Sequence, residues 1–444
     1  MTTHDGEVAL PTRRIALASF AGTTIEFYDF FIYGTAAALV FPKVFFPALG
    51  TAAGTIASLA SVAVAFIARP LGSALFGHLG DRLGRKRTLV YTLLLMGLST
   101  VAIGALPGSA TIGIAAPIIL MVLRFLQGVA VGGEWGGAAL LAVEYAPPGK
   151  HGRFGMFPQL GPGTAFGLSS ATFLVVELLL SPDAFLAWGW RIPFLLSSLL
   201  VIIGLYVRLR VEETPVFREL HAERERRIRD AAPLRAAFGR DTRLILLAGG
   251  TVAAAFALNY MGTVYLTTYG STVLAIPRPT MLALGVVGGI VLAGATAAGA
   301  AASDRFGRRR VVLTGNLVTL ACGLIAFPII DTGNTALVGI GLCLLMIGGG
   351  IVLGPAAAYL AELFATGHRY TAAGMSYNVA TIIGGGVPPV LAAGLVAAYG
   401  SNAIGVMLGV YGVLSIACGL LLPETKERSL RQIGATEPES AATR

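Results

Sequence analysis

Long apolar stretches, separated by short polar turns, run through almost the whole chain. A helix needs roughly 20 consecutive apolar residues to cross the ~30 Å hydrocarbon core of a membrane. The pattern therefore predicts an all-α integral membrane protein with twelve transmembrane helices. These predicted spans lie at residues 15–41, 54–77, 88–107, 112–145, 154–180, 186–208, 243–270, 280–302, 310–330, 335–364, 371–399 and 402–422.

Two of the polar turns are diverged copies of one another. GHLGDRLGRKR, residues 77–87, recurs as AAASDRFGRRR, residues 300–310. Each copy has a carboxylate that can bind a helix end or an arginine, cations that stay in the cytosol, and a glycine that permits positive φ. Because the order of these residues is kept in both copies, the chain contains a duplicated unit.

The duplication extends to Glu144 and Glu362, which end the fourth and tenth predicted spans. Each is followed by a glycine and a basic patch. We expect these acids to pair with the repeated loops at the cytoplasmic face and to control a conformational change. The residues assigned to this gating role are Asp81, Arg82, Gly84, Arg85, Glu144, Arg153, Asp304, Arg305, Gly307, Arg308, Glu362 and Arg369.

Composition agrees with a chain that lies in lipid. Hydrophobic residues make up 55% of the sequence and charged residues 12%, and the mean hydropathy is +0.77. A soluble domain carries about twice that charged fraction. Cys322, Cys343 and Cys418 lie in apolar spans without a paired spacing, so neither a disulfide nor a metal site is expected.

The cations predict the topology. With both chain ends inside, only Lys43, Arg191 and Arg278 of the 32 Lys and Arg residues fall outside, and Arg69 and Arg124 fall within spans. This asymmetry follows the positive-inside rule, so we expect both termini in the cytoplasm and the protein in the plasma membrane. It also argues against a nucleic-acid partner for the net charge of +9. The first 14 residues contain no apolar run, and we expect no removable signal peptide.

The first span carries two carboxylates near its centre. Glu26 and Asp29 are three residues apart, hence on one helix face. Tyr33 continues this face one turn later and is a candidate to contact substrate or a charged partner. This face must point inward, because a charge exposed to lipid at mid-depth costs several kcal/mol. Arg69 in the second span lies at a matching depth, and we expect it to pair with Glu26 or Asp29. Either these charges only hold two helices together, or one carboxylate loads and releases a proton.

The fourth span adds Arg124 and, ten residues later, Glu134. Glu134 is a third candidate for proton coupling, beside Glu26 and Asp29. For Arg124 three interpretations stay open: it contacts an anionic substrate group, it neutralises Glu134 or Asp29, or it only packs.

Spans 5 and 11 contain helix-breaking clusters, GPG at 161–163 and GGGVPP at 384–389. Interrupted spans at corresponding positions of two repeats indicate a transporter's central site. Gln159 and Asn378 precede these clusters at equivalent places, and they either contact substrate or form hydrogen bonds between helices. In span 7, Asn259 and Tyr260 are further candidates to line the cavity.

The repeated loops resemble the signature of the major facilitator superfamily. Further stretches are similar to its metabolite:proton symporter branch: GTTIEFYDFFIYG (22–34), RFLQGVAVGGEWGGAALLAVEYAP (124–147), WGWRIPFL (188–195) and EETPVF (212–217). The resemblance implies two pseudo-symmetric six-helix bundles that rock about a midplane site. It also implies proton-coupled uptake, by a secondary active transporter, of an organic acid such as shikimate or α-ketoglutarate, or a zwitterion such as proline or betaine.

Two alternative functions are a proton-coupled exporter of amphipathic compounds and a transporter-like membrane sensor. Nucleotide-binding, metal-cluster and nucleophile motifs are absent from the sequence, so we expect no enzyme, cofactor or metal. The expected partners are a small metabolite, a proton and the lipid bilayer, with the chain acting as a monomer. The expected division is a cytoplasmic tail (1–14), a first bundle (15–208), a cytoplasmic linker (209–242), a second bundle (243–422) and a cytoplasmic tail (423–444).

Overall fold

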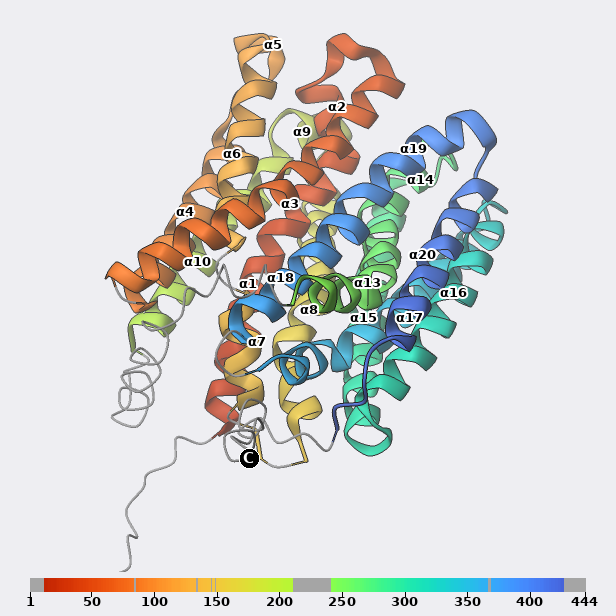
Figure 1. The fold of residues 1–444 in the computed structure, drawn as a ribbon. Helices are drawn as coiled ribbons and strands as arrows, with labels where there is room; N and C mark the ends of the chain where they lie inside the picture. The colour runs from red at the N-terminus through yellow and green to blue at the C-terminus, as the bar shows by residue number, and fades with distance from the viewer. Residues whose placement is uncertain are drawn as a thin grey trace, which may run out of the picture.

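The computed structural model describes residues 12–83, 85–132, 135–144, 146–147, 149–210, 241–365 and 369–426, which form helices joined by short turns. Figure 1 shows long, roughly aligned helices gathered into one elongated body. The long helices of the first half are α1 (Thr12–Leu39), α3 (Gly50–Leu83), α4 (Arg85–Ala105), α6 (Ala115–Gly132), α7 (Trp135–Glu144), α8 (His151–Leu179) and α10 (Ile192–Arg210).

The second half repeats this order of long helices. Its elements are α13 (Thr242–Tyr260), the π-helical turn η3 (Met261–Tyr265), α14 (Leu266–Thr272), α15 (Arg278–Phe306), α16 (Arg308–Ile330), α17 (Thr335–Leu363), α18 (Arg369–Thr381), the π-helical turn η4 (Ile382–Gly386), α19 (Val387–Tyr399) and α20 (Asn402–Leu420). Short helices connect the others: α2 (Phe41–Val44), η1 (Pro47–Leu49), α5 (Ser109–Ile112), α9 (Pro182–Ala187) and η2 (Gly189–Arg191).

The two halves pair their helices in the same way. In the first half α1 packs on α8, α3 on α6, and α4 on α10. In the second half α13 packs on α18, α15 on α17, and α16 on α20, which are the helices six spans further along. This shared pairing gives two pseudo-symmetric six-helix bundles, as the duplicated loops predict.

Ten helices in the described part of the chain are long and apolar enough to cross a membrane. A shorter apolar helix, Val90–Ala105, lies within α4. The remaining long helix, α1, carries Glu26 and Asp29 at its centre, which lower its apolar character. Together these helices account for the twelve predicted spans.

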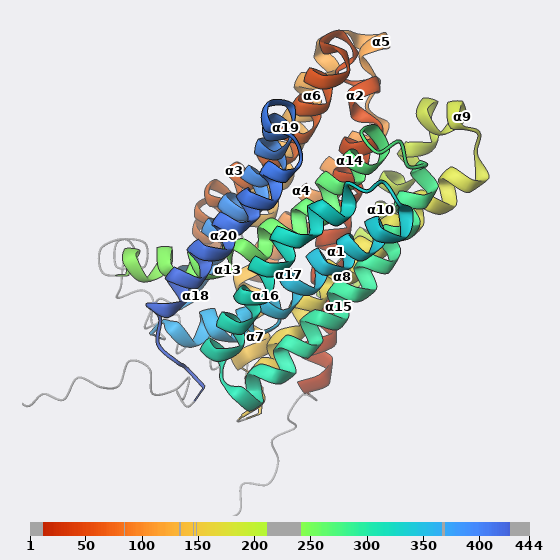
Figure 2. The same cartoon turned by 90° about the vertical axis from the view of Figure 1, so that its right-hand side faces the viewer.

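Several helices of the first bundle pack against the second bundle. The long helices α8 and α15 pack tightly against each other, α3 packs against η4 and α19, and α1 packs against η3 and α14. Figure 2, turned by 90°, shows α15 alongside α8 and α1 on one side of the body. At the α8–α15 crossing, a Cβ on Gly163 would lie 2.7 Å from the backbone nitrogen of Ala293, so the two backbones approach too closely for a side chain.

The predicted interruption of span 5 is wrong. Helix α8 runs unbroken from His151 to Leu179 and keeps Pro158 and Pro162 inside it. The glycines of the cluster instead fit α8 against neighbours, since a Cβ on Gly161 would meet Thr23 of α1. Span 11 does deviate from α-helical geometry at η4, and span 7 deviates at η3, which the sequence did not predict. Such π-helical turns are frequent at functional sites.

Candidate functional site

Asp29 lies fully buried at the centre of the first bundle, with 1% of its surface exposed. Its Oδ2 accepts a hydrogen bond of 2.9 Å from the Thr100 hydroxyl of α4, and its Oδ1 accepts one from the Ser197 hydroxyl of α10. A carboxylate without a cation in direct contact must be stabilised by such donors or become protonated. Asp29 is therefore held by groups that can also tolerate its neutral form.

Arg124 of α6 is also fully buried and reaches Asp29 only through intermediates. Its Nη1 donates to Gln127 Oε1 at 3.0 Å, Gln127 Nε2 donates to the Thr100 hydroxyl at 2.7 Å, and Thr100 donates to Asp29. The Arg124 guanidinium lies over the Tyr33 ring at 3.9 Å from its centroid. Its Nε and Nη2 have no hydrogen-bond partner among the described residues. Three N–H donors of a buried cation, one on Nε and two on Nη2, are thus available to a ligand.

Asp29 does not form the ion pair predicted with Arg69, because hydroxyl groups hold its carboxylate. Arg69 and Glu26 are both buried and line the same small cavity, and a pair between these two side chains stays a prediction. The Arg69 guanidinium lies 4.8 Å from the centroid of the Phe66 ring, and its Nε has no hydrogen-bond partner in the described part of the chain. This cation–π contact stabilises the buried guanidinium.

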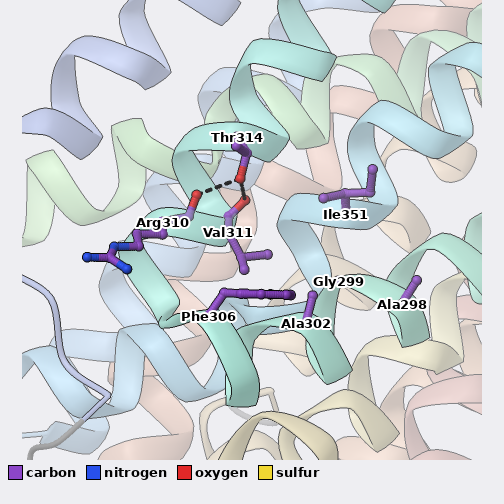
Figure 3. A pocket seen from close by; sticks show the side chains of 8 residues that line it. All are labelled: Ala298, Gly299, Ala302, Phe306, Arg310, Val311, Thr314 and Ile351. Carbon is purple, nitrogen blue, oxygen red and sulfur yellow. Dashed lines mark hydrogen bonds between the residues drawn. The ribbon is translucent and has the colours of Figure 1, made fainter.

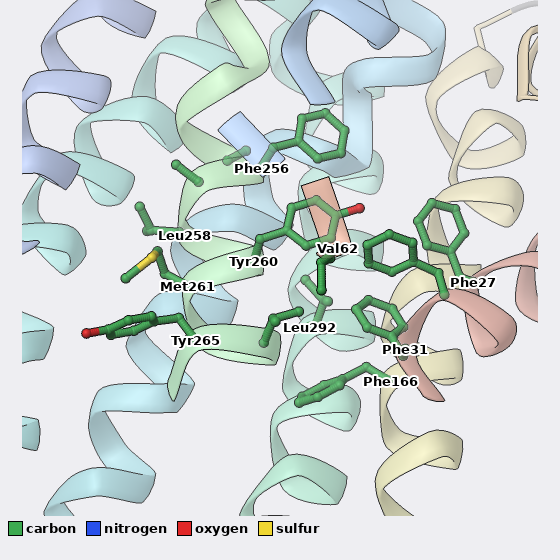
Figure 4. Packing of buried hydrophobic residues seen from close by; sticks show 14 of the residues in the cluster. Phe27, Phe31, Val62, Phe166, Phe256, Leu258, Tyr260, Met261, Tyr265 and Leu292 are labelled. Atoms are coloured by element: carbon green, nitrogen blue, oxygen red, sulfur yellow. The ribbon is translucent and has the colours of Figure 1, made fainter. Parts of the chain in front are cut away.

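An aromatic cluster closes the interface beside these charges. Tyr260 of α13 packs against Phe30 of α1 and Phe66 of α3, with ring centroids 5.3 and 5.1 Å apart. Figure 4 shows Tyr260 extending from the second bundle toward the side that carries Phe27 and Phe31. The cavity between Glu26, Asp29, Arg69 and Arg124 measures only about 10 Å³. That is the lower limit for a single water molecule, so the site is closed in this conformation.

The polar candidates of the other spans fall into two groups. Gln159 is 1% exposed, and neither amide atom has a partner among the residues described; Asn259 also keeps an unpartnered Oδ1. By contrast, Asn378 donates to the Ser73 hydroxyl of α3 at 3.3 Å, which joins the bundles, and the Tyr33 hydroxyl donates to Ser61 at 2.8 Å. Gln159 and Asn259 therefore fit a ligand-binding role better than Asn378 and Tyr33. Glu134 lies outside the described residues.

The second repeated loop joins the two bundles. Asp304 accepts hydrogen bonds from the backbone N–H groups of Gly152 and Arg153, at 2.8 and 2.9 Å, at the start of α8. This places a carboxylate at a helix N-terminus, where the helix dipole favours negative charge. Arg308 forms two ion pairs: its Nη1 lies 2.7 Å from Asp304 Oδ1, and its Nε lies 3.3 Å from Glu362 Oε2.

Two further contacts cross the interface at this end. His151 Nδ1 lies 3.2 Å from Glu362 Oε1, and Arg369 Nη1 lies 3.8 Å from Glu144 Oε1. Gly307 has φ of 102°, and the Glu424 carboxylate beside it accepts the backbone N–H of Arg308 at 2.8 Å. Of the first repeated loop, Asp81 and Arg82 lie in α3 and Arg85 begins α4. Gly84 lies outside the described residues.

The opposite end of the interface holds an ion pair that sequence analysis missed. Arg278, at the start of α15, places its Nε 3.2 Å from Glu177 Oε1, near the end of α8. The side chains are 22% and 6% exposed, and the Arg278 guanidinium lies 5.1 Å from the Phe185 ring centroid. Both ends of the interface are therefore closed by ionic contacts between the bundles.

Sequence analysis also missed the hydrogen-bonded residues around Asp29. Thr100, Gln127 and Ser197 are the polar side chains that link this carboxylate to Arg124 or support it directly. One signal was available, since Gln127 follows Arg124 by three residues and shares its helix face. Hydroxyl residues are frequent in apolar helices, and sequence alone does not single out Thr100 and Ser197.

Known proteins match this chain over almost its whole length. The model of a family described as "Sugar (and other) transporter" matches residues 15–241 and 218–436. The inner membrane metabolite transport protein YhjE of Escherichia coli (strain K12) is 46% identical, and the match covers 94% of this chain and 95% of that protein. The shikimate transporter of the same organism is 39% identical, over 88% and 89% of the two chains. Among solved structures, the proton:xylose symporter XylE has a TM-score of 0.72 at 18% identity, covering 96% of this chain and 98% of that one.

Proposed function

Because the chain belongs to the sugar (and other) transporter family of the major facilitator superfamily, we propose that it takes up a small carboxylate-bearing metabolite together with a proton. The observation that carries this proposal is the buried Arg124 with unused N–H donors. Its Nε and Nη2, like the Nε of Arg69, have no hydrogen-bond partner among the described residues, while Asp29 is bound by hydroxyl groups. A substrate carboxylate would supply the missing acceptors, because arginine matches its planar geometry.

Proton coupling rests on Asp29. Its partners are neutral hydroxyls that can act either as donors to the ionised form or as acceptors from the protonated form. The relay through Thr100 and Gln127 connects it to Arg124, so the charge of Asp29 acts on the group that would hold the substrate. A proton on Asp29 would strengthen the pull of Arg124 on an anion, which couples the two ligands.

Alternating access requires the contacts at the two ends of the interface to break in turn. The ionic network around Asp304, Arg308 and Glu362 closes one end, and Glu177 with Arg278 closes the other. We place the repeated-loop end and both termini on the cytoplasmic side of the plasma membrane, since the cations gather there. The division into two bundles of residues 15–208 and 243–422, and action as a monomer, are part of the same proposal.

Substrate binding tests the proposal without any need for transport. Purified protein in nanodiscs is titrated with shikimate, α-ketoglutarate, proline and betaine, and heat of binding is measured. Loss of one partner of a buried charge pair costs about 2 kcal/mol or more, so Arg124→Gln should weaken binding by more than about 30-fold. Arg243→Gln, an exposed arginine at the start of α13, is the matched control. Equal affinity of Arg124→Gln and the control for every ligand would refute the assignment.

A further inference from the structure

An apolar groove lies on the outer surface of the second bundle, near the repeated-loop end. It measures about 430 Å³ and runs between α15 and α16, with Ile351 of α17 beside it. Figure 3 shows Ala298, Ala302 and Phe306 along α15 and Thr314 on α16. The Thr314 hydroxyl is used within its own helix, since it donates to the Arg310 carbonyl at 2.6 Å. The groove therefore offers a ligand almost only hydrocarbon surface.

The groove continues a face of the bundle that must meet the membrane. On α15 the exposed residues include Val287 and Ile290, at 48% and 68%, and on α16 Leu317 is 55% exposed. Large apolar side chains exposed along transmembrane helices face lipid tails. A cavity that opens on this face, further along the same two helices, is accessible to hydrocarbon chains rather than to water.

Two arginines lie near the Phe306 end of the groove. Arg310 lines it, and Arg305 holds its guanidinium 5.2 Å from the Phe306 ring centroid. Within the described ranges, neither arginine side chain makes an ion pair with a carboxylate. Their neighbours differ, because Arg308 binds Asp304 and Glu362, and Arg309 donates to the backbone carbonyls of Gly419 and Leu420 at the end of α20.

We propose that this groove binds an anionic phospholipid, with one acyl chain along Ala298, Ala302 and Phe306 and the phosphate between Arg305 and Arg310. Basic residues at the membrane boundary attract anionic lipid, and a groove between transmembrane helices fixes the chain beneath the headgroup. Phe306 is 55% exposed at the boundary and separates the polar mouth from the apolar groove. The lipid would cover the junction of α15 and α16, beside the loop that joins the bundles.

Native mass spectrometry of the full-length protein tests the proposal, with equal amounts of phosphatidylglycerol and phosphatidylcholine present. Two cations near the membrane surface predict roughly 30-fold more retained phosphatidylglycerol than phosphatidylcholine. Arg305→Gln combined with Arg310→Gln should bring this ratio close to one. Ala302→Phe, which fills the groove without a change in charge, should remove the retained lipid.

Matched controls separate this site from general effects of charge and folding. Arg243→Gln removes an exposed arginine on α13, and Ala283→Phe enlarges an exposed alanine at the other end of α15, so both should retain lipid like the wild type. A ratio near one for the wild type would overturn the proposal, as would equal lipid retention by Ala302→Phe. If Ala302→Phe instead changes only the oligomeric state, a second copy occupies the groove. If millimolar inorganic phosphate removes the preference, the arginines bind free phosphate and the lipid assignment is wrong.

Discussion

The ion pair between Glu177 and Arg278 should set the balance between the closed and open states at its end of the interface. It joins α8 of one bundle to α15 of the other, so it cannot persist when the bundles separate there. Glu177→Gln removes the charge with little change in shape. The closed state then loses an ionic contact that the open state does not contain, and the open state gains population.

The burial of the two side chains sets the free-energy cost of removing one of them from the ion pair. Removing one partner of a fully buried pair costs 3–5 kcal/mol, and an exposed pair contributes about 0–1 kcal/mol. Glu177 is 6% exposed and Arg278 22%, so this pair falls between those limits, at about 2 kcal/mol. A change of that size shifts the ratio of the two states by about 30-fold.

Double electron–electron resonance measures this shift directly. Spin labels at Ile114 and Tyr399, which are 80% and 78% exposed at this end of opposite bundles, report the separation after the native cysteines are replaced. Glu177→Gln should move the distance distribution toward longer separations, while Asp183→Asn, an exposed acid on α9, should not. If Glu177→Gln and Asp183→Asn give the same distribution as the parent, the pair does not hold this end closed.

Other perturbations test the packing, the loop and the pH dependence. Gly132→Leu should lower the midpoint of thermal unfolding, since overpacking costs about 1–3 kcal/mol and a Cβ there would meet the Arg69 carbonyl; Gly22→Ala, with open space around it, should not. Asp304→Asn weakens the bond to the start of α8, so labelling of a cysteine placed within the interface at that end should become faster. Burial alone would raise the pKa of Glu424, but four backbone N–H groups that donate to its carboxylate outweigh burial and lower it. Glu424 therefore adds stability above its unfolded pKa, near 4.3, and this is lost as the pH falls through its folded pKa, so acid should destabilise the wild type more than Glu424→Gln.

The helices could be predicted from the sequence because a helix that crosses a membrane must meet one simple physical requirement. Crossing a membrane needs a long apolar run, and the predicted spans match the observed helices closely. The proline and glycine cluster of span 5 predicts an interruption that the structure does not have, since Pro158 and Pro162 remain inside α8. In tightly packed helices a proline removes one hydrogen bond without ending the helix, and neighbouring helices compensate.

The sequence identifies the charged residues of the candidate site, but it does not identify which side chains they contact. Glu26, Asp29, Arg69 and Arg124 were found because charges in apolar spans are costly and face inward. Depth alone suggested that Arg69 would pair with Glu26 or Asp29, but depth does not specify rotation about the helix axis, and hydroxyl groups hold Asp29 instead. The order of residues likewise gave no sign of the Glu177 pair, because its two halves come from different bundles.

Gradient-driven uptake into proteoliposomes tests the central claim most directly. Labelled shikimate, α-ketoglutarate, proline and betaine are offered with and without an inward proton gradient, to the wild type and to Asp29→Asn. We expect one carboxylate to accumulate in the wild type only with the gradient, and Asp29→Asn to lose this accumulation while it keeps exchange of substrate across the membrane. Accumulation that is unchanged in Asp29→Asn would contradict the role of Asp29. Pumping of a lipophilic dye, with no uptake of any of the four metabolites, would contradict the account as a whole.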